Sequence, residues 1–272
     1  MPLMRCSAWL LVCALVVPAV AQAAEPAALA RARVLYNAAD YDGAIAAATE
    51  ARRLPTSADA GSLVLARAHL ERYRQRADPA DLSAARDALQ SIKQDALSPR
   101  DRVDLLVGFG QSLFLGEAFG AAAELFETAL VQSATLSHRA RTLLLDWWAS
   151  ALDREAQSRP PDRRNPVYAR IIDRMEDELR VDPASAPASY WLPVAARGLG
   201  DLDRAWDAAI AGWVRAALKP ETAPSIRADI DRFVTNVLIP EKARQRQGQA
   251  RDGQESAAAL HSEWELVKSQ WK

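Results

Sequence analysis

Cysteine and histidine are scarce in this 272-residue sequence. The two cysteines, Cys6 and Cys13, both lie within the first segment of the chain. The three histidines, His69, His138 and His261, are far apart and show none of the His-x-His or His-x-x-x-His spacings of metal sites. We therefore predict no metal site and no cofactor, and we expect neither disulfides nor thiolate chemistry beyond the first segment.

Net charge is also nearly absent, and residues that favour β-strands are few. The 34 Lys and Arg residues balance 35 Asp and Glu residues, so no overall positive field attracts nucleic acid. Val, Ile and Thr supply about a ninth of the residues, whereas Ala alone supplies about a fifth. Because Ala favours helices and β-branched residues favour strands, we predict an all-α protein that does not bind nucleic acid.

Sequence motifs of enzymes are missing as well. The chain contains no Gly-x-Ser-x-Gly nucleophile elbow and no phosphate-binding loop that ends in Gly-Lys-Ser/Thr. Gly108-Phe109-Gly110 resembles part of a dinucleotide fingerprint, but it falls inside a predicted helix with no strand before it. The carboxylates of residues 173–178 alternate with Arg170, Arg174 and Arg180, which is typical of a solvated, ion-paired face. We therefore predict a protein without catalytic activity.

The first residues have the layout of a secretory signal peptide. One cation, Arg5, precedes an apolar stretch over residues 8–17, which ends at Pro18, and Ala21-Gln22-Ala23 offers a small-x-small cleavage site. The stretch is shorter than the ~20 residues that cross a bilayer, so we expect cleavage and no stable membrane insertion afterwards. Residues 1–23 thus predict an exported chain, most favoured in the periplasm or cell envelope, with the extracellular space as another destination.

Beyond residue 24 the sequence indicates helices separated by short breaks, and one pattern recurs among them. A large apolar residue is followed three positions later by alanine and, seven positions after that, by another small residue. Both small residues fall on one helical face, where they allow a neighbouring helix to approach closely. The three copies are Tyr41 with Ala44 and Ala51, Phe119 with Ala122 and Ala129, and Leu202 with Ala205 and Gly212, and a weaker copy has Leu82 with Ala85.

The copy around Ala122 extends into the segment before it and resembles the tetratricopeptide repeat family. Leu106, Phe109, Gly110 and Leu113 on a first helix precede Phe119, Ala122, Phe126 and Ala129 on a second. The resemblance implies antiparallel helix pairs of about 34 residues, stacked into a right-handed solenoid. We expect this domain to span residues 25–218, with atypical capping helices after it.

In that family, the first helix of each pair lines a concave surface that binds proteins or peptides. The resemblance therefore implies a non-catalytic interaction module or assembly scaffold with a protein or peptide partner. Two alternatives stay open: an accessory subunit that positions an envelope enzyme, and a polysaccharide-binding or hydrolytic protein that uses exposed tryptophans and carboxylates. Carried over residue by residue, the implied groove is lined by Arg33, Tyr36, Asp104, Val107, Gln111, Phe114, Tyr190, Val194 and Arg197.

The C-terminal part departs from the repeat in three segments. An apolar stripe at helical spacing predicts a capping helix over residues 219–243 that packs on the last repeat. Residues 244–254 are polar and contain two glycines, which predicts a solvated linker. Residues 255–272 predict an amphipathic helix. The first stripe consists of Ile226, Ile230, Phe233 and Val237, and the final helix carries Leu260, Trp264, Val267 and Trp271.

Three arrangements of the final helix are open. It can dock on the repeats as a cap, fill the concave groove as an internal ligand, or bind a partner or a membrane. The membrane is the least favoured, because Lys268 and Lys272 are matched by Glu255, Glu263 and Glu265, whereas helices on membrane surfaces carry an excess of cations. We expect both tryptophans of this helix to be buried.

Proline positions give further expectations. Residues 154–165 are predicted to form a long polar connection. Pro193 is expected in the first turn of a helix that starts near Ala188, and Pro240 is expected to kink or divide the run over residues 224–249.

Two adjacent tryptophans, Trp147 and Trp148, point about 100° apart on a helix. We expect one of them in the core and the other at a surface or an interface.

Overall fold

A computed structural model describes residues 26–247 and 253–271. All regular secondary structure in these ranges is helical, which confirms the all-α prediction. The predicted signal peptide, residues 1–23, lies outside the described residues. None of the helices in the described ranges combines the length and the apolar character that a membrane span requires.

The helices follow one another with short connections. They are α1 (Ala27–Asn37), α2 (Tyr41–Arg52), α3 (Ala58–Arg76), α4 (Pro79–Gln90), α5 (Pro99–Leu115), α6 (Phe119–Val131), α7 (His138–Gln157), α8 (Pro161–Val181), α9 (Ala186–Gly198), α10 (Leu202–Ala216), α11 (Ala223–Phe233), α12 (Ile239–Gln247) and α13 (Gly253–Gln270). Short 3-10 turns, Gln94–Ala96 and Ser133–Thr135, precede α5 and α7.

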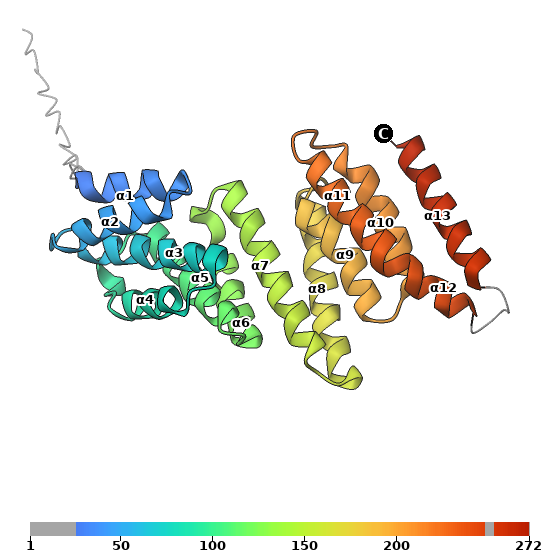
Figure 1. The fold of residues 1–272 in the computed structure, drawn as a ribbon, viewed down its shortest axis with the longest axis horizontal. Helices are drawn as coiled ribbons and strands as arrows, with labels where there is room; N and C mark the ends of the chain where they lie inside the picture. Colours follow the sequence, from blue (N-terminus) through green and yellow to red (C-terminus); the bar gives the residue numbers. More distant parts are fainter. Residues whose placement is uncertain (1–25, 248–252, 272) are drawn as a thin grey trace, which may run out of the picture.

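The helices stack in chain order into an elongated array that runs from α1 at one end to α13 at the other (Figure 1). Each odd-numbered helix from α1 to α9 packs against the even-numbered helix that follows it, so these helices form pairs. The first helices also contact one another along the array, from α1 through α3, α5, α7 and α9 to α11. They therefore form one continuous layer, and each second helix packs against the first helix of the next pair.

Three of the turns within pairs share one backbone geometry. Ala39, Glu117 and Gly200 adopt left-handed φ values of 59°, 63° and 80°. At each turn, the amide of this residue donates to the carbonyl three residues back, and the next amide donates to the carbonyl five residues back. This is the hydrogen-bond pattern of a Schellman motif. The turns lead into α2, α6 and α10, which are the helices that carry the three copies of the sequence pattern.

The small residues of the pattern are buried where helices meet. Because these side chains are small, the helices can approach closely. Gly110 of α5 illustrates this close approach, since a Cβ atom on it would lie 2.5 Å from Cε1 of Phe126. Phe119 is half-buried, and its ring lies edge-on to Phe114 with centroids 5.2 Å apart. The predicted alanines with no exposed surface are Ala44, Ala51, Ala122, Ala129 and Ala205.

Gly212 has a specific role that involves Pro193. Because α9 begins at Ala186, Pro193 lies in the helix interior, and the expectation of a first-turn proline is wrong. A proline has no amide hydrogen, so it cannot donate to the Ser189 carbonyl one turn earlier. That carbonyl faces α10, where a Cβ atom on Gly212 would lie 2.6 Å from it. Glycine at this position lets α9 and α10 pack together where the hydrogen-bond ladder of α9 is interrupted.

The expected long connection over residues 154–165 is also wrong. Helix α7 continues to Gln157 and α8 starts at Pro161, so only residues 158–160 separate them. Proline is favoured in the first turn of a helix because the amides there have no intrahelical acceptor. The paired prolines therefore start a helix instead of forming a loop.

Pro240 is accommodated by a wider helical turn. A π-helical segment, Val234–Leu238, joins α11 to α12, and Pro240 is the second residue of α12. In a π-helix the amides donate to the carbonyl five residues back, as the Ile239 amide does to the Val234 carbonyl, and the next residue, Pro240, has no amide hydrogen to donate. The predicted kink or break is thus a local widening of the helix.

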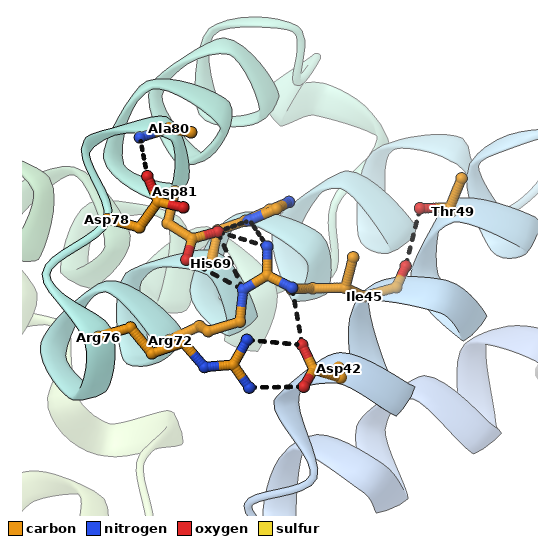
Figure 2. Close-up of polar contacts among 9 residues, drawn as sticks. All are labelled: Asp42, Ile45, Thr49, His69, Arg72, Arg76, Asp78, Ala80 and Asp81. Carbon is orange, nitrogen blue, oxygen red and sulfur yellow. Dashed lines mark hydrogen bonds and ion pairs between the residues drawn. The ribbon is translucent and has the colours of Figure 1, made fainter.

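An ionic network fixes α2, α3 and α4 to one another (Figure 2). Asp81 of α4 accepts hydrogen bonds from Arg72 Nε at 3.0 Å, and one of its oxygens lies 2.7 Å from His69 Nδ1. Asp42 of α2 accepts from Arg72 and Arg76, each at 2.7 Å. The side chain of Asp81 is only 3% exposed. The hydrogen bonds from Arg72 lower the pKa of Asp81, although burial opposes this effect.

The final helix docks against the end of the array, which is the first of the three arrangements considered. Leu260 and Trp264 are completely buried, but Trp271 is 51% exposed, so only one of its tryptophans is buried as expected. The apolar residues of α11 pack on α10, as predicted. In the predicted linker, residues 244–247 continue α12 as a helix, and residues 248–252 lie outside the described residues.

Candidate binding groove

Three adjoining cavities run along the layer of first helices. Their volumes are about 230, 430 and 480 Å³, and we call them the N-terminal, central and C-terminal cavities. Because neighbouring cavities share walls, they form one groove that extends from α1 to α11. The first two cavities share Tyr36, Arg67, Arg100 and Asp104, and the last two share Leu143, Asp146 and Ser150.

The N-terminal cavity is lined by paired charges around a tyrosine. Arg67 of α3 lies over the ring of Tyr36 at 4.7 Å, and its Nη1 donates to Asp104 Oδ2 at 3.2 Å. Arg100 Nε donates to the same oxygen at 3.3 Å, and Arg33 Nη2 donates to Asp101 Oδ1 at 3.0 Å. Burial raises the pKa of Tyr36, and the charge of Arg67 opposes the rise.

Arg67 also carries an unsatisfied donor. Its Nε is buried and has no hydrogen-bond acceptor among the described residues. A buried donor without an acceptor costs roughly 1–3 kcal/mol.

Aromatic rings form the wall of the central cavity. Phe114 of α5 meets Trp147 of α7 edge-on, with centroids 5.0 Å apart, and Arg74 of α3 lies over the Trp147 ring at 5.1 Å. Gln111 is buried at the same wall, and Leu143 is 54% exposed although it is a large apolar residue. Exposed apolar and aromatic surface in a concave site provides the anchors on which peptide affinity depends.

The two tryptophans of α7 divide as predicted. Trp148 is completely buried in the core, whereas Trp147 faces the central cavity.

The C-terminal cavity has acidic and aromatic walls. Asp146 accepts a hydrogen bond from Trp191 Nε1 at 2.8 Å, and Tyr190 and Asp229 also line this cavity. Asp146 is open to solvent, yet the surrounding concave wall desolvates its carboxylate and raises its pKa. The Trp191 hydrogen bond opposes this rise and the charge of Asp229 adds to it. The lining of this cavity contains no Lys or Arg, whereas the other two cavities carry several arginines.

The predicted groove residues fall into two groups. Val194 packs against the hydrophobic core and lies outside the three cavities. Arg197 pairs with Glu241 of α12 through two hydrogen bonds of 2.8 and 2.5 Å, and it also lies outside them. The remaining seven line the groove: Arg33, Tyr36, Asp104, Val107, Gln111, Phe114 and Tyr190.

Sequence reasoning missed most of the contributions of α3 and α7 to the groove, and for α7 it predicted only that one ring of the Trp147-Trp148 pair lies at a surface or an interface. These helices provide Arg67, Arg74, Leu143, Asp146 and Trp147. The repeat that contains α3 has only a weak copy of the pattern, and the segment around α7 lacks its small residues. The available signal was the Trp147-Trp148 pair, because one ring of such a pair must face away from the core.

Within residues 26–247 and 253–271, no three His, Cys, Asp or Glu side chains gather in a group that could hold a metal ion. Searches against models of known protein families and against curated proteins find no match to this chain.

Proposed function

We propose that this chain is an exported, non-catalytic interaction protein of the tetratricopeptide repeat type, which binds a protein or peptide segment in the groove. The destination proposed is the periplasm or cell envelope, on the basis of the signal-peptide pattern of residues 1–23. The proposal assigns the chain neither a nucleic-acid ligand nor a stable membrane-inserted state.

The observation that carries the proposal is the continuity of the groove. The three cavities share walls, and all three are lined mainly by the first helices. In helical-repeat proteins, stacking produces an extended concave surface of this kind, which suits a linear ligand better than a compact small molecule. The repeated turns before α2, α6 and α10 support the assignment to stacked repeats of one type.

The walls suggest how a peptide is held. Phe114, Trp147 and Leu143 offer apolar contacts in the centre, where burial contributes most of the affinity. The arginines of the N-terminal cavity and the carboxylates of the C-terminal cavity lie on either side of this centre. Charges arranged in this way fix the direction and register of the ligand more than its affinity.

The proposal is tested by affinity capture of the tagged chain from its native envelope after crosslinking. We expect polypeptide partners with the original chain, and their loss with Gln111→Glu or Phe114→Ala. Val181→Ser serves as the matched control, because Val181 is 82% exposed at the end of a second helix. Thermal melting of each variant verifies that it remains folded.

Two outcomes would contradict the proposal. Partners that remain bound to both groove variants would place the binding site elsewhere. Retention of polysaccharide that depends on Trp147, without any polypeptide partner, would favour the sugar-binding alternative.

A further inference from the structure

The C-terminal cavity differs from the other two in its charge. Its walls come from α7, α9 and α11 and carry the carboxylates of Asp146 and Asp229, but no Lys or Arg. Its volume of about 480 Å³ is within the range of sites that enclose ligand groups. In the N-terminal cavity, by contrast, Arg33, Arg67 and Arg100 stand beside two aspartates. The negative charge of the C-terminal cavity is therefore not balanced by its own lining.

The aromatic rings of the groove show the same difference. The two cavities with arginines each have a guanidinium over a ring, 4.7 Å from the ring of Tyr36 and 5.1 Å from that of Trp147. In the C-terminal cavity, Tyr190 and Trp191 meet edge-on, and no cation of the described residues lies over either ring. Tyr190 is only half-buried. Since ring faces attract cations, its ring offers a contact that the chain itself leaves unused.

Both carboxylates of the cavity have room for a further partner. One oxygen of Asp146 accepts from Trp191 Nε1 at 2.8 Å, and its other oxygen has no donor among the described residues. Asp229 pairs with Arg232 at 3.4 Å on the same helix, and both side chains are exposed. Exposed pairs of this kind contribute little, so Asp229 remains available to a ligand.

The negative charges of this region act together on Tyr190. Burial raises the pKa of this tyrosine most, and the charges of Asp229, Asp153 and Asp146 raise it further. The charge of Arg232 opposes this effect. Negative charge thus accumulates around one aromatic ring of the groove, and a cation at this place relieves the repulsion among the carboxylates.

We propose that the C-terminal cavity is a pocket for a basic side chain, lysine or arginine, of the polypeptide that binds in the groove. This inference rests on the proposed function and adds the chemistry of one ligand residue to it. The basic group lies over the Tyr190 ring and pairs with Asp146 and Asp229, as the chain's own arginines do with rings and carboxylates in the N-terminal cavity. Because the central cavity shares Leu143 with this pocket, the ligand carries an apolar residue close to its basic one.

Nuclear magnetic resonance of the Trp191 indole tests the pocket, because its Nε1–H group donates to Asp146. Trp191→Phe identifies the signal among those of the eight tryptophans. The probe is the blocked peptide acetyl-Leu-Ala-Arg-amide, and the matched control replaces its arginine by citrulline, which has nearly the same shape without the charge. We expect a saturable shift with the arginine peptide and an affinity about tenfold lower with the citrulline peptide.

Two variants test the walls. Asp146→Asn keeps an acceptor for Trp191 but removes the charge, and Asp229→Asn does the same on the opposite helix. We expect each to weaken the binding of the arginine peptide by about two- to fivefold and to leave that of the citrulline peptide nearly unchanged. Asp207→Asn is the matched control, because Asp207 is exposed on the second helix α10 and lies outside the cavity. It should bind the arginine peptide as the original chain does.

Three outcomes would overturn the proposal. The first is the absence of a saturable Trp191 shift with the arginine peptide, and the second is an equal affinity for the two peptides. The third is an affinity for the arginine peptide that neither Asp146→Asn nor Asp229→Asn lowers. Free butylguanidinium distinguishes a polypeptide side chain from a small organic cation. We expect it to bind more weakly than the arginine peptide, and equal binding would contradict a polypeptide as the source of the cation.

Affinity capture from the native envelope separates this inference from the proposed function. Polypeptides that depend on Phe114 but bind the Asp146→Asn/Asp229→Asn double variant as well as the original chain would support the groove and contradict the basic pocket. If no polypeptide is captured while the arginine peptide still shifts the Trp191 signal, the proposed function fails although the cavity binds a basic group.

Discussion

In the α5/α6 pair, the second helix carries Ala122 and Ala129 at its contacts, whereas the first helix turns Gln111 and Phe114 toward the groove. The same division holds for α9 and α10, where Tyr190 lines a cavity and Ala205 is buried. The second helices thus provide close packing, and the first helices line the groove. The comparison teaches that a recurring small-residue pattern identifies the packing layer and says little about the residues of the groove.

The largest effect on stability is expected at the ionic network. Asp81→Asn removes the charge that accepts from Arg72, and hydrogen bonds to charged groups contribute about 1.5–3 kcal/mol. Because the pKa of Asp81 is lowered in the fold, its contribution is present above the unfolded value of about 3.9 and is lost as the pH falls through the folded value. Urea unfolding at pH 7 and at pH 2 measures this difference. An equal loss at both pH values would exclude the charge as its cause.

A packing position in the second helices comes next. Ala122→Leu inserts a larger side chain into a fully packed contact and is expected to cost about 1–3 kcal/mol of unfolding free energy. Ala121→Leu on the same helix is the control, because Ala121 is exposed and its replacement should change stability by less than about 0.5 kcal/mol. Denaturant midpoints of the two variants measure the contrast. Equal midpoints would remove the basis for a packing role of Ala122.

A groove carboxylate should behave in the opposite way to Asp81. Desolvation by the concave wall raises the pKa of Asp146, so its charged form is disfavoured in the fold, and stability decreases as the pH rises through the folded pKa. Asp146→Asn is therefore expected to raise stability at neutral pH by no more than about 1 kcal/mol, since solvent screens this accessible group. The gain should vanish at pH 2, where the carboxylate is protonated in both states. A gain that persists at pH 2 in thermal melts would point to another cause.

The smallest effect is expected at the repeated turn. Glu117 has a left-handed φ that glycine adopts more readily, so Glu117→Gly should stabilise the chain by up to about 1 kcal/mol. Gly200→Ala, at the corresponding turn before α10, should destabilise it by a similar amount. Thermal melting of both variants tests whether the turns are equivalent, and changes of the same sign would show that they are not.

The sequence predicts the packing layer well because the small residues at the helix contacts recur at regular spacings. Every predicted alanine of the pattern is buried, and Gly110 and Gly212 both lie where a side chain would clash. The predictions at the paired prolines 160–161 and at Pro193 are wrong, because proline disfavours a helix interior on average but starts one helix here and is tolerated inside another.

The groove was predicted less completely. Seven of the nine predicted residues line it. Arg197 instead forms an ion pair with Glu241 of α12, and the alignment of the repeats could not predict this contact. The residues of α3 and α7 were missed because groove positions carry no periodic constraint of their own.

Site-specific photocrosslinking from the groove tests the central claim most directly. A photoreactive residue at position 143, where Leu143 is exposed in the groove, should crosslink a polypeptide in the native envelope, and Phe114→Ala should abolish the product. The same photoreactive residue at position 181, at the end of a second helix, should not give this product. A product that forms equally from both positions, or that survives Phe114→Ala unchanged, would contradict a binding site in the layer of first helices.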